Sequence, residues 1–259
     1  MTIFEAIIFG VVQGLTEFLP VSSSGHLVIL HQLFGEHTGD LSFDVMLHLA
    51  TLLAVLVYFR KDIIHILNIL WGTVTFKTVE QKEKTLLQAL ILGTIPAGIL
   101  GALFASPIES LFRGTVSVAG ALILGSVLFV IAEKVSKRNK EITRKRGFIV
   151  GCFQALALVP GISRSGSTIS GGLILGFTRE EAVRFSFLLS VPIILGAGLV
   201  KILGGSSLTL GAPVLLGGIA AFISGLWAVN FLVNFLKGHT LMPFVWYRVI
   251  LALLLIFIF

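Results

Sequence analysis

The chain has 259 residues, of which 56% are hydrophobic and only 12% charged, and its mean hydropathy is +1.01. Soluble domains carry about 25% charged residues, so the composition excludes a water-soluble globule, a nucleic-acid-binding protein and a disordered chain. A single cysteine, Cys152, cannot form an internal disulfide. No Lys or Arg precedes Arg60, so the basic segment of a cleavable signal peptide is missing. The sequence predicts a polytopic membrane protein.

Six stretches are long and apolar enough to cross a membrane, which takes about 20 residues for about 30 Å of hydrocarbon. Two further apolar regions are interrupted near their middle. In chain order the predicted elements are a broken region at 3–34, spans at 41–59, 86–105 and 116–131, a second broken region at 148–177, and spans at 182–203, 212–236 and 241–259.

Each broken region contains a cluster of Pro, Ser and Gly, at 20–25 in the first and 160–166 in the second. The halves on either side are too short to span a bilayer. Non-helical backbone at membrane depth persists only where protein buries it or where it lines a wet cavity. We therefore expect two re-entrant hairpins, each made of two half-helices that meet at a polar tip.

Basic residues set the expected orientation, because loops rich in Lys and Arg stay in the cytoplasm. Most of the 19 Lys and Arg residues fall in the connections after the first and third spans, at 60–84 and 134–146. The loop between these connections, at 106–114, holds only Arg113. We expect both basic connections to be cytoplasmic and both termini to lie outside. The basic residues at 134–146 are explained by a solvated cytoplasmic loop, and contact with the headgroups of membrane lipids would be an addition.

A shift of 141 residues superimposes the two broken regions. Each region is followed by three spans, and since three is odd, the second copy enters the membrane from the opposite side. This is the inverted-repeat plan, in which broken helices place a binding site near the midplane. The sequence predicts one all-α membrane domain, with repeat 1 at about 1–133, a basic loop at about 134–147 and repeat 2 at about 148–259. The matched pairs are Gly10 and Gly151, Gln13 and Gln154, Leu15 and Leu156, Ser22 and Ser163, Ser24 and Ser165, and Gly25 and Gly166.

The hairpins concentrate polar side chains, which are costly within a membrane and usually functional. Gln13 and Glu17 lie one helical turn apart and share a face. Ser/Gly-rich turns that open a half-helix present several N–H groups to an anion. Arg164 adds a planar donor fork that matches phosphate oxygens. Together these groups point to phosphoryl-transfer chemistry. Taken singly, a buried histidine is also found as a hydrogen-bonded core residue, and Ser and Gly are also found in plain helix packing.

Two nucleophiles are compatible with this pattern. His26 titrates near neutral pH and is able to attack phosphorus or protonate a leaving oxygen. Ser23 is the rival, activated if His26 or Glu17 accepts its proton. In the first span, Asp44 and His48 lie one turn apart, either as partners of the site or in ordinary interhelical hydrogen bonds. The remaining histidines, near predicted ends and loops, are expected to be solvated: His31, His37, His65 and His239.

Two long segments, 13–26 and 160–168, resemble the two signature motifs of the bacterial undecaprenyl-diphosphatase family of the bacitracin-resistance type. The segment from Phe43 to Arg60 resembles that family's first span, and the resemblance covers essentially the whole chain. It implies an enzyme of the inner membrane that removes the terminal phosphate of undecaprenyl diphosphate. The product is the monophosphate carrier lipid, which is reused for peptidoglycan and other envelope polymers.

The same resemblance assigns roles to residues. It implies that Glu17 is essential, that His26 is a nucleophile or acid/base, and that Ser23 is the rival nucleophile. It also implies that Arg164 binds phosphate, and that Gln13 and Glu17 bind a divalent cation, Mg²⁺ or Ca²⁺, together with substrate oxygens. The other tip residues expected at the phosphate are Ser22, Ser24, Gly25, Ser163, Ser165 and Gly166.

The leading interpretation is thus a polyprenyl-diphosphate hydrolase whose cavity opens to the exterior and whose apolar groove holds the lipid tail. A lipid flippase or transporter with the same inverted repeats is the alternative, and a homodimer is left open. The membrane acid-phosphatase superfamily is rejected, because its chemistry needs a histidine about six residues beyond the Ser-Arg pair, where Ser170 stands.

Overall fold

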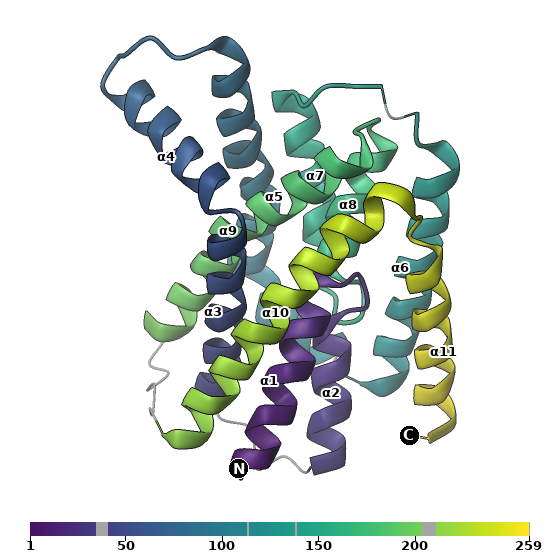
Figure 1. Ribbon diagram of the computed structural model, residues 1–259. Coiled ribbons are helices and arrows are strands. Elements are labelled where there is room, and N and C mark those ends of the chain that lie inside the picture. The colour runs from purple at the N-terminus through teal and green to yellow at the C-terminus, as the bar shows by residue number, and fades with distance from the viewer. Residues whose placement is uncertain (35–40, 113, 138, 204–210, 259) are drawn as a thin grey trace.

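The computed structural model describes residues 1–34, 41–112, 114–137, 139–203 and 211–258, and the regular elements within them are helices (Figure 1). They are α1 (Ile3–Phe18), α2 (Ser23–Phe34), α3 (Leu41–Tyr58), α4 (Arg60–Val74), α5 (Gln81–Phe112), α6 (Thr115–Val135), α7 (Arg144–Leu156), α8 (Arg164–Ile174), α9 (Arg179–Leu203), α10 (Ala212–Gly238) and α11 (Met242–Ile258). The prediction of an all-α membrane protein is confirmed.

Four of these helices, α5, α6, α9 and α10, are long and apolar enough to cross a membrane. Helix α3 meets this criterion only together with α4, from which it is bent by 84°, and α11 is apolar but shorter. Helix α4 was not predicted. The connection after the first span was expected to be a basic loop, but Arg60 and Lys61 open a helix that continues with Ile63, Ile66 and Leu67.

Both broken regions form pairs of helices joined at a tip, as predicted. The first pair is α1 and α2, and the second is α7 and α8. Helix α7 begins at Arg144, four residues earlier than expected. The two pairs enter the bundle from opposite ends (Figure 1). Helix α1 begins with a capping box, in which Thr2 and Glu5 exchange side-chain and backbone hydrogen bonds.

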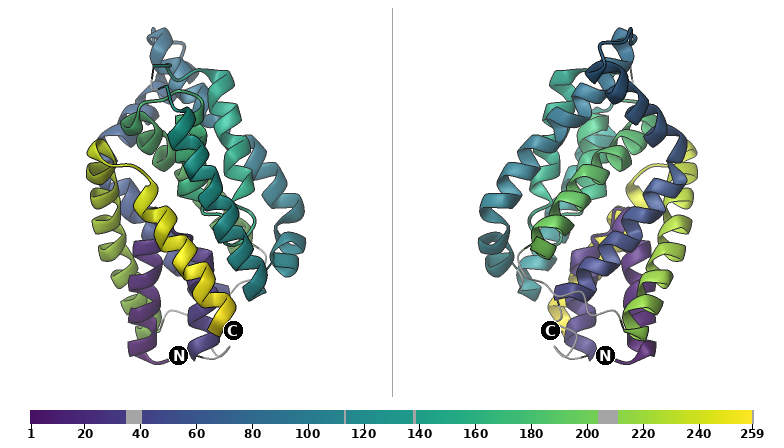
Figure 2. Two further views of the ribbon diagram at one scale, coloured as in Figure 1. Left: turned by 90° about the vertical axis from the view of Figure 1, so that its right-hand side faces the viewer. Right: turned by 90° about the vertical axis from the view of Figure 1, so that its left-hand side faces the viewer.

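Both termini lie at one end of the molecule, and α4 and the described residues 136, 137 and 139–143 lie at the other (Figure 1). The described basic residues of these connections therefore gather at the end opposite the termini. The sequence predicts the same arrangement, with the basic connections and the termini on opposite sides. Arg113, Arg138 and His37 lie outside the described residues. Seen from the side, the helices diverge toward the end that carries the termini (Figure 2).

Glycines allow the two hairpins to pack closely on long helices of the opposite repeat. A Cβ atom on Gly10 of α1 would lie 2.1 Å from the carbonyl oxygen of Gly217 on α10. A Cβ atom on Gly151 of α7 would lie 2.2 Å from the carbonyl oxygen of Gly93 on α5. The repeats are thus interlocked, because the hairpin of each packs against the second of the three predicted spans of the other, α10 or α5.

Candidate functional site

The two hairpin tips share the same local geometry. Ser22 and Ser163 have φ angles of 73° and 77°, in the left-handed region that non-glycine residues seldom adopt. The Ser22 hydroxyl accepts a hydrogen bond from the Gly25 N–H at 3.3 Å, and the Ser163 hydroxyl accepts one from the Gly166 N–H at 3.2 Å. Each serine thereby caps the half-helix that follows the tip.

The tips also contact each other. The Gly161 N–H of the second tip donates to the Ser24 hydroxyl of the first at 3.4 Å. In return, the Ser165 hydroxyl of the second tip donates to the Leu19 carbonyl of the first at 3.3 Å. Two segments separated by more than 130 residues in the sequence therefore form one polar surface inside the bundle.

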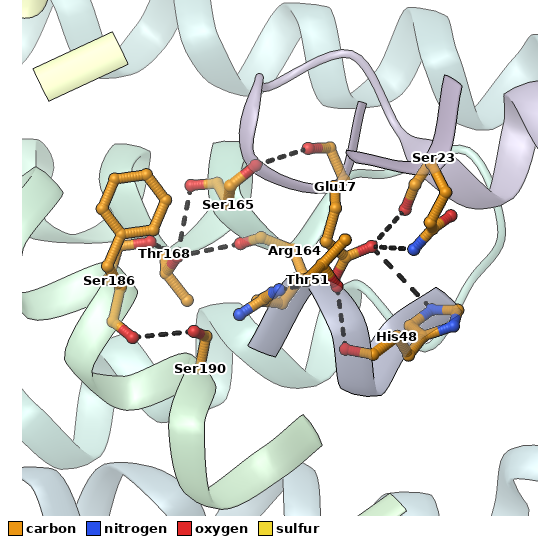
Figure 3. Close-up of polar contacts among 12 residues, drawn as sticks. Glu17, Ser23, His48, Thr51, Arg164, Ser165, Thr168, Ser186 and Ser190 are labelled. Atoms are coloured by element: carbon orange, nitrogen blue, oxygen red, sulfur yellow. Dashed lines mark hydrogen bonds and ion pairs between the residues drawn. The ribbon is translucent and has the colours of Figure 1, made fainter. Parts of the chain in front are cut away.

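Glu17 lies at the centre of this surface (Figure 3). Arg164 Nη2 donates to Glu17 Oε1 at 2.6 Å, so an ion pair joins the two hairpins. The Ser23 hydroxyl and Gln13 Nε2 both donate to Glu17 Oε2, at 2.7 and 2.9 Å. His48 Nε2 lies 3.8 Å from the same oxygen. The carboxylate is only 8% exposed and is positioned to accept the proton of the Ser23 hydroxyl.

His26 points elsewhere. Its Nδ1 lies 2.8 Å from the Ser22 carbonyl, and its Nε2 lies 2.7 Å from the hydroxyl of Tyr247 on α11, on whose ring the imidazole stacks. The structure therefore does not bring His26 together with Glu17 and Arg164, and its catalytic role stays a prediction. The histidine that approaches Glu17 is His48.

A cavity of about 340 Å³ opens beside the ion pair, lined by both tips and by α3, α5 and α9. Among the predicted phosphate-binding residues, Ser22, Ser24 and Ser163 line it. Gly25, Ser165 and Gly166 lie outside its lining: Gly25 and Gly166 are the capped N–H donors, and Ser165 is bonded to the first tip.

The cavity extends from the tips toward the end that carries the termini, because it reaches Ala105 of α5 and Lys201 near the end of α9. Thr168, a polar residue of the second hairpin, faces away from it. Its hydroxyl lies 2.6 Å from that of Ser186 and fixes α8 to α9 (Figure 3).

Arg248 of α11 is a residue that the sequence reading missed. It is fully buried, and its guanidinium donates to the carbonyl oxygens of Pro20, Gly161 and Ile162 at 3.4, 2.9 and 3.0 Å. It also donates to the Leu122 carbonyl of α6 at 3.0 Å. Arg248 therefore ties both tips to α6. The sequence held one indication of this role, because an arginine within a predicted span is costly unless other groups bind it.

Asp44 and His48 were predicted either to be partners of the site or to form ordinary interhelical hydrogen bonds, and the structure places them differently. His48 lines the cavity, as a partner of the site would. Asp44 instead approaches His31, with 3.8 Å between carboxylate and imidazole.

The expectation that His31 is solvated was wrong, because its side chain is 15% exposed and packs on Phe9. His239 and His65 are both exposed as expected, and His65 also pairs with Glu83 at 3.1 Å.

The residues of the site offer few metal ligands. Within the described residues, no group of three or more His, Cys, Asp and Glu side chains is placed to hold a metal ion. Gln13 Oε1 is buried without a hydrogen-bond partner beside Glu17, so one neutral oxygen and one carboxylate are available. This pair fits a divalent cation only where phosphate oxygens complete its coordination.

Comparisons with known proteins assign the chain to a family. The family model described as bacitracin resistance protein BacA matches residues 6–254. An undecaprenyl-diphosphatase of Methanosphaera stadtmanae is 43% identical over 99% of this chain and 98% of its own length. Proteins of the same name from Elusimicrobium minutum and Alteromonas mediterranea are 43% and 41% identical, over 99% and 100% of this chain and 98% and 100% of their own lengths. The chain therefore belongs to the bacitracin resistance protein BacA family.

Proposed function

We propose that the protein hydrolyses undecaprenyl diphosphate to undecaprenyl phosphate and inorganic phosphate, and so recycles the carrier lipid of envelope polymer synthesis. The relatives that match it over their whole length carry the name of this enzyme. The observation that carries the proposal is the contact of Glu17 with both Ser23 and Arg164 beside a cavity inside an apolar bundle.

In the proposed reaction, Arg164 and the N–H groups of the tips neutralise charge on the terminal phosphoryl group. Glu17 accepts the proton of Ser23, whose oxygen attacks the terminal phosphorus. The bond from that phosphorus to the bridging oxygen breaks, the bridging oxygen takes the proton, and the monophosphate lipid leaves. Water then hydrolyses the phosphoserine and releases phosphate. The hydrogen bond from Ser23 to Glu17 favours this serine over His26 as the nucleophile.

A divalent cation, Mg²⁺ or Ca²⁺, belongs to the proposal. Gln13 and Glu17 would hold it together with diphosphate oxygens, and it would supply further positive charge to the phosphoryl group. The partnerless Gln13 Oε1 supports this assignment.

We further propose that the protein lies in the inner membrane, with its basic end in the cytoplasm and its cavity open to the exterior. The gathering of basic residues at the end opposite the termini supports this orientation. A flippase is the second candidate, favoured by the two hairpins that enter from opposite ends.

The test is phosphate release from undecaprenyl diphosphate by the purified protein in detergent. We expect Arg164→Ala and Glu17→Gln each to lower the rate by about 10³-fold, because the first removes the cation that faces the phosphoryl group and the second removes the base that accepts the Ser23 proton. Arg184→Ala is the matched control, because Arg184 is exposed and pairs with Asp62 outside the site. EDTA should abolish release, and Mg²⁺ or Ca²⁺ should restore it.

Nearly unchanged release from both variants would overturn the assignment of the site. A wild-type protein that moves the lipid across vesicle membranes but releases no phosphate would establish the flippase instead.

A further inference from the structure

Gln154 is a buried amide that the proposed reaction does not use. It is 2% exposed, and neither its Nε2 nor its Oε1 has a hydrogen-bond partner in the described part of the chain. Buried polar groups are almost always hydrogen-bonded, so a side chain with both atoms unpaired calls for an explanation. Gln154 lines the cavity, where a bound molecule would reach it.

Its counterpart in the first hairpin shows why this amide is unpaired. Gln13, 141 residues earlier, donates to Glu17 one turn further along its helix. The residue one turn beyond Gln154 is Leu158, which has no polar atom in its side chain. Gln154 therefore lines the cavity with an unpaired amide donor and acceptor, whereas the Gln13 donor has a carboxylate partner.

Lys201 gives the cavity its net positive charge. The charged side chains lining the cavity, among the described residues, are Glu17, Arg164 and Lys201, with His48 the titratable neighbour. Glu17 and Arg164 neutralise each other through their ion pair. Lys201 has no ion-pair partner in the described part of the chain, so it leaves the cavity with a net positive charge. A diphosphate carries at least two negative charges, and Arg164 faces only part of it.

From the unpaired amide of Gln154 and the unpaired charge of Lys201 in one cavity lining, we propose that the two residues form a second phosphate subsite, which binds the phosphate that stays on the lipid. The inference rests on the proposed function, in which the terminal phosphate occupies the space beside Ser23 and Arg164. Lys201 lies near the end of α9, on the face that also presents Ile194 and Ala197 to the cavity. This apolar face is suited to the first isoprene units beyond the phosphate.

The experiment measures binding of farnesyl monophosphate, a soluble prenyl monophosphate, to the purified protein by calorimetry. We expect Lys201→Gln and Gln154→Leu each to weaken binding by about tenfold, as the loss of a hydrogen bond to a charged group does. Lys201→Arg should bind within about twofold of the wild type. Lys237→Gln, a change in the exposed lysine at the opposite end of the chain's membrane bundle, is the matched control and should also leave binding unchanged.

Inhibition of turnover by inorganic phosphate separates the two subsites, because free phosphate would occupy the Arg164 subsite. We expect its inhibition constant to change by less than about twofold in Lys201→Gln. Unchanged farnesyl monophosphate binding in both variants would overturn the inference, as would an equal loss of affinity for inorganic phosphate. Failure of the proposed function is recognised separately, by a wild-type protein that releases no phosphate.

Discussion

The two hairpins have the same frame and different chemistry. Ser22 and Ser163 adopt the same unusual φ and cap the following half-helix in the same way. Gly10 and Gly151 allow the same close approach to a long helix. At these positions the two sequences are identical after the shift of 141 residues. Shared positions therefore build two tips of one shape that fit against each other.

The chemistry lies where the two copies differ. Glu17 of the first hairpin corresponds to Leu158 of the second, and Ser23 corresponds to Arg164. The first tip thus supplies a carboxylate and a hydroxyl, while the second supplies a cation and an apolar wall. Perfect symmetry would place like groups opposite each other and would leave Glu17 without its partner. Divergence within a symmetric frame is what creates the ion pair.

The largest predicted effect comes from Arg248, whose guanidinium binds carbonyl oxygens of both tips and of α6. Arg248→Met removes the donors to carbonyl oxygens of both tips and leaves these oxygens buried and unpaired. We expect the free energy of unfolding to fall by about 3–5 kcal/mol, and phosphate release to fall with it. Denaturant unfolding in detergent measures the first quantity.

Arg248→Lys serves as the comparison, because an ammonium keeps the charge but lacks the planar fork. It should fall between the wild type and Arg248→Met. A stability for Arg248→Met within about 1 kcal/mol of the wild type, which is the range of ordinary substitutions, would contradict a role in joining the tips.

The second prediction tests the equivalence of the two frames. Gly10→Ala and Gly151→Ala should each lower the free energy of unfolding by about 2–4 kcal/mol, as strong overpacking does, because each added Cβ would collide with a carbonyl oxygen of a neighbouring helix. Gly120→Ala in α6 is the control, since nothing lies within 4 Å of the added Cβ. It should be neutral or stabilising by up to about 1 kcal/mol. A large cost in only one hairpin would show that the frames are not equivalent.

The sequence predicted the features that depend on local pattern. Apolar length indicated the long helices, and the repeated Pro, Ser and Gly clusters indicated two tips that meet, with Glu17 and Arg164 together. The direction of a side chain was beyond such patterns. His26 lies three residues from Ser23, yet it turns to Tyr247 of the last helix, while His48 of α3 approaches Glu17.

Arg248 and α4 were missed for different physical reasons. The partners of Arg248 are mostly backbone carbonyl oxygens of three distant segments, and backbone acceptors have no sequence signature. Helix α4 begins with Arg60 and Lys61, whose charges indicated a solvated loop, although Ile64 and Leu67 continue an apolar helical face. Tertiary contacts therefore decided the role of Arg248, whereas the apolar face of α4 is exposed at Ile64 and Leu67.

The smallest predicted effect concerns the serines that open the two tips. Ser22→Ala and Ser163→Ala each lose the capping hydroxyl and keep a side chain at a positive φ, so we expect a loss of about 1 kcal/mol in the free energy of unfolding. Ser22→Gly and Ser163→Gly lose the same hydroxyl but remove the backbone strain. They should lower the free energy of unfolding by only about 0.3 kcal/mol. Denaturant unfolding of the four variants measures this difference. If alanine and glycine prove equivalent at both tips, the left-handed backbone there stores no strain, and the common geometry must be imposed by the contacts between the tips.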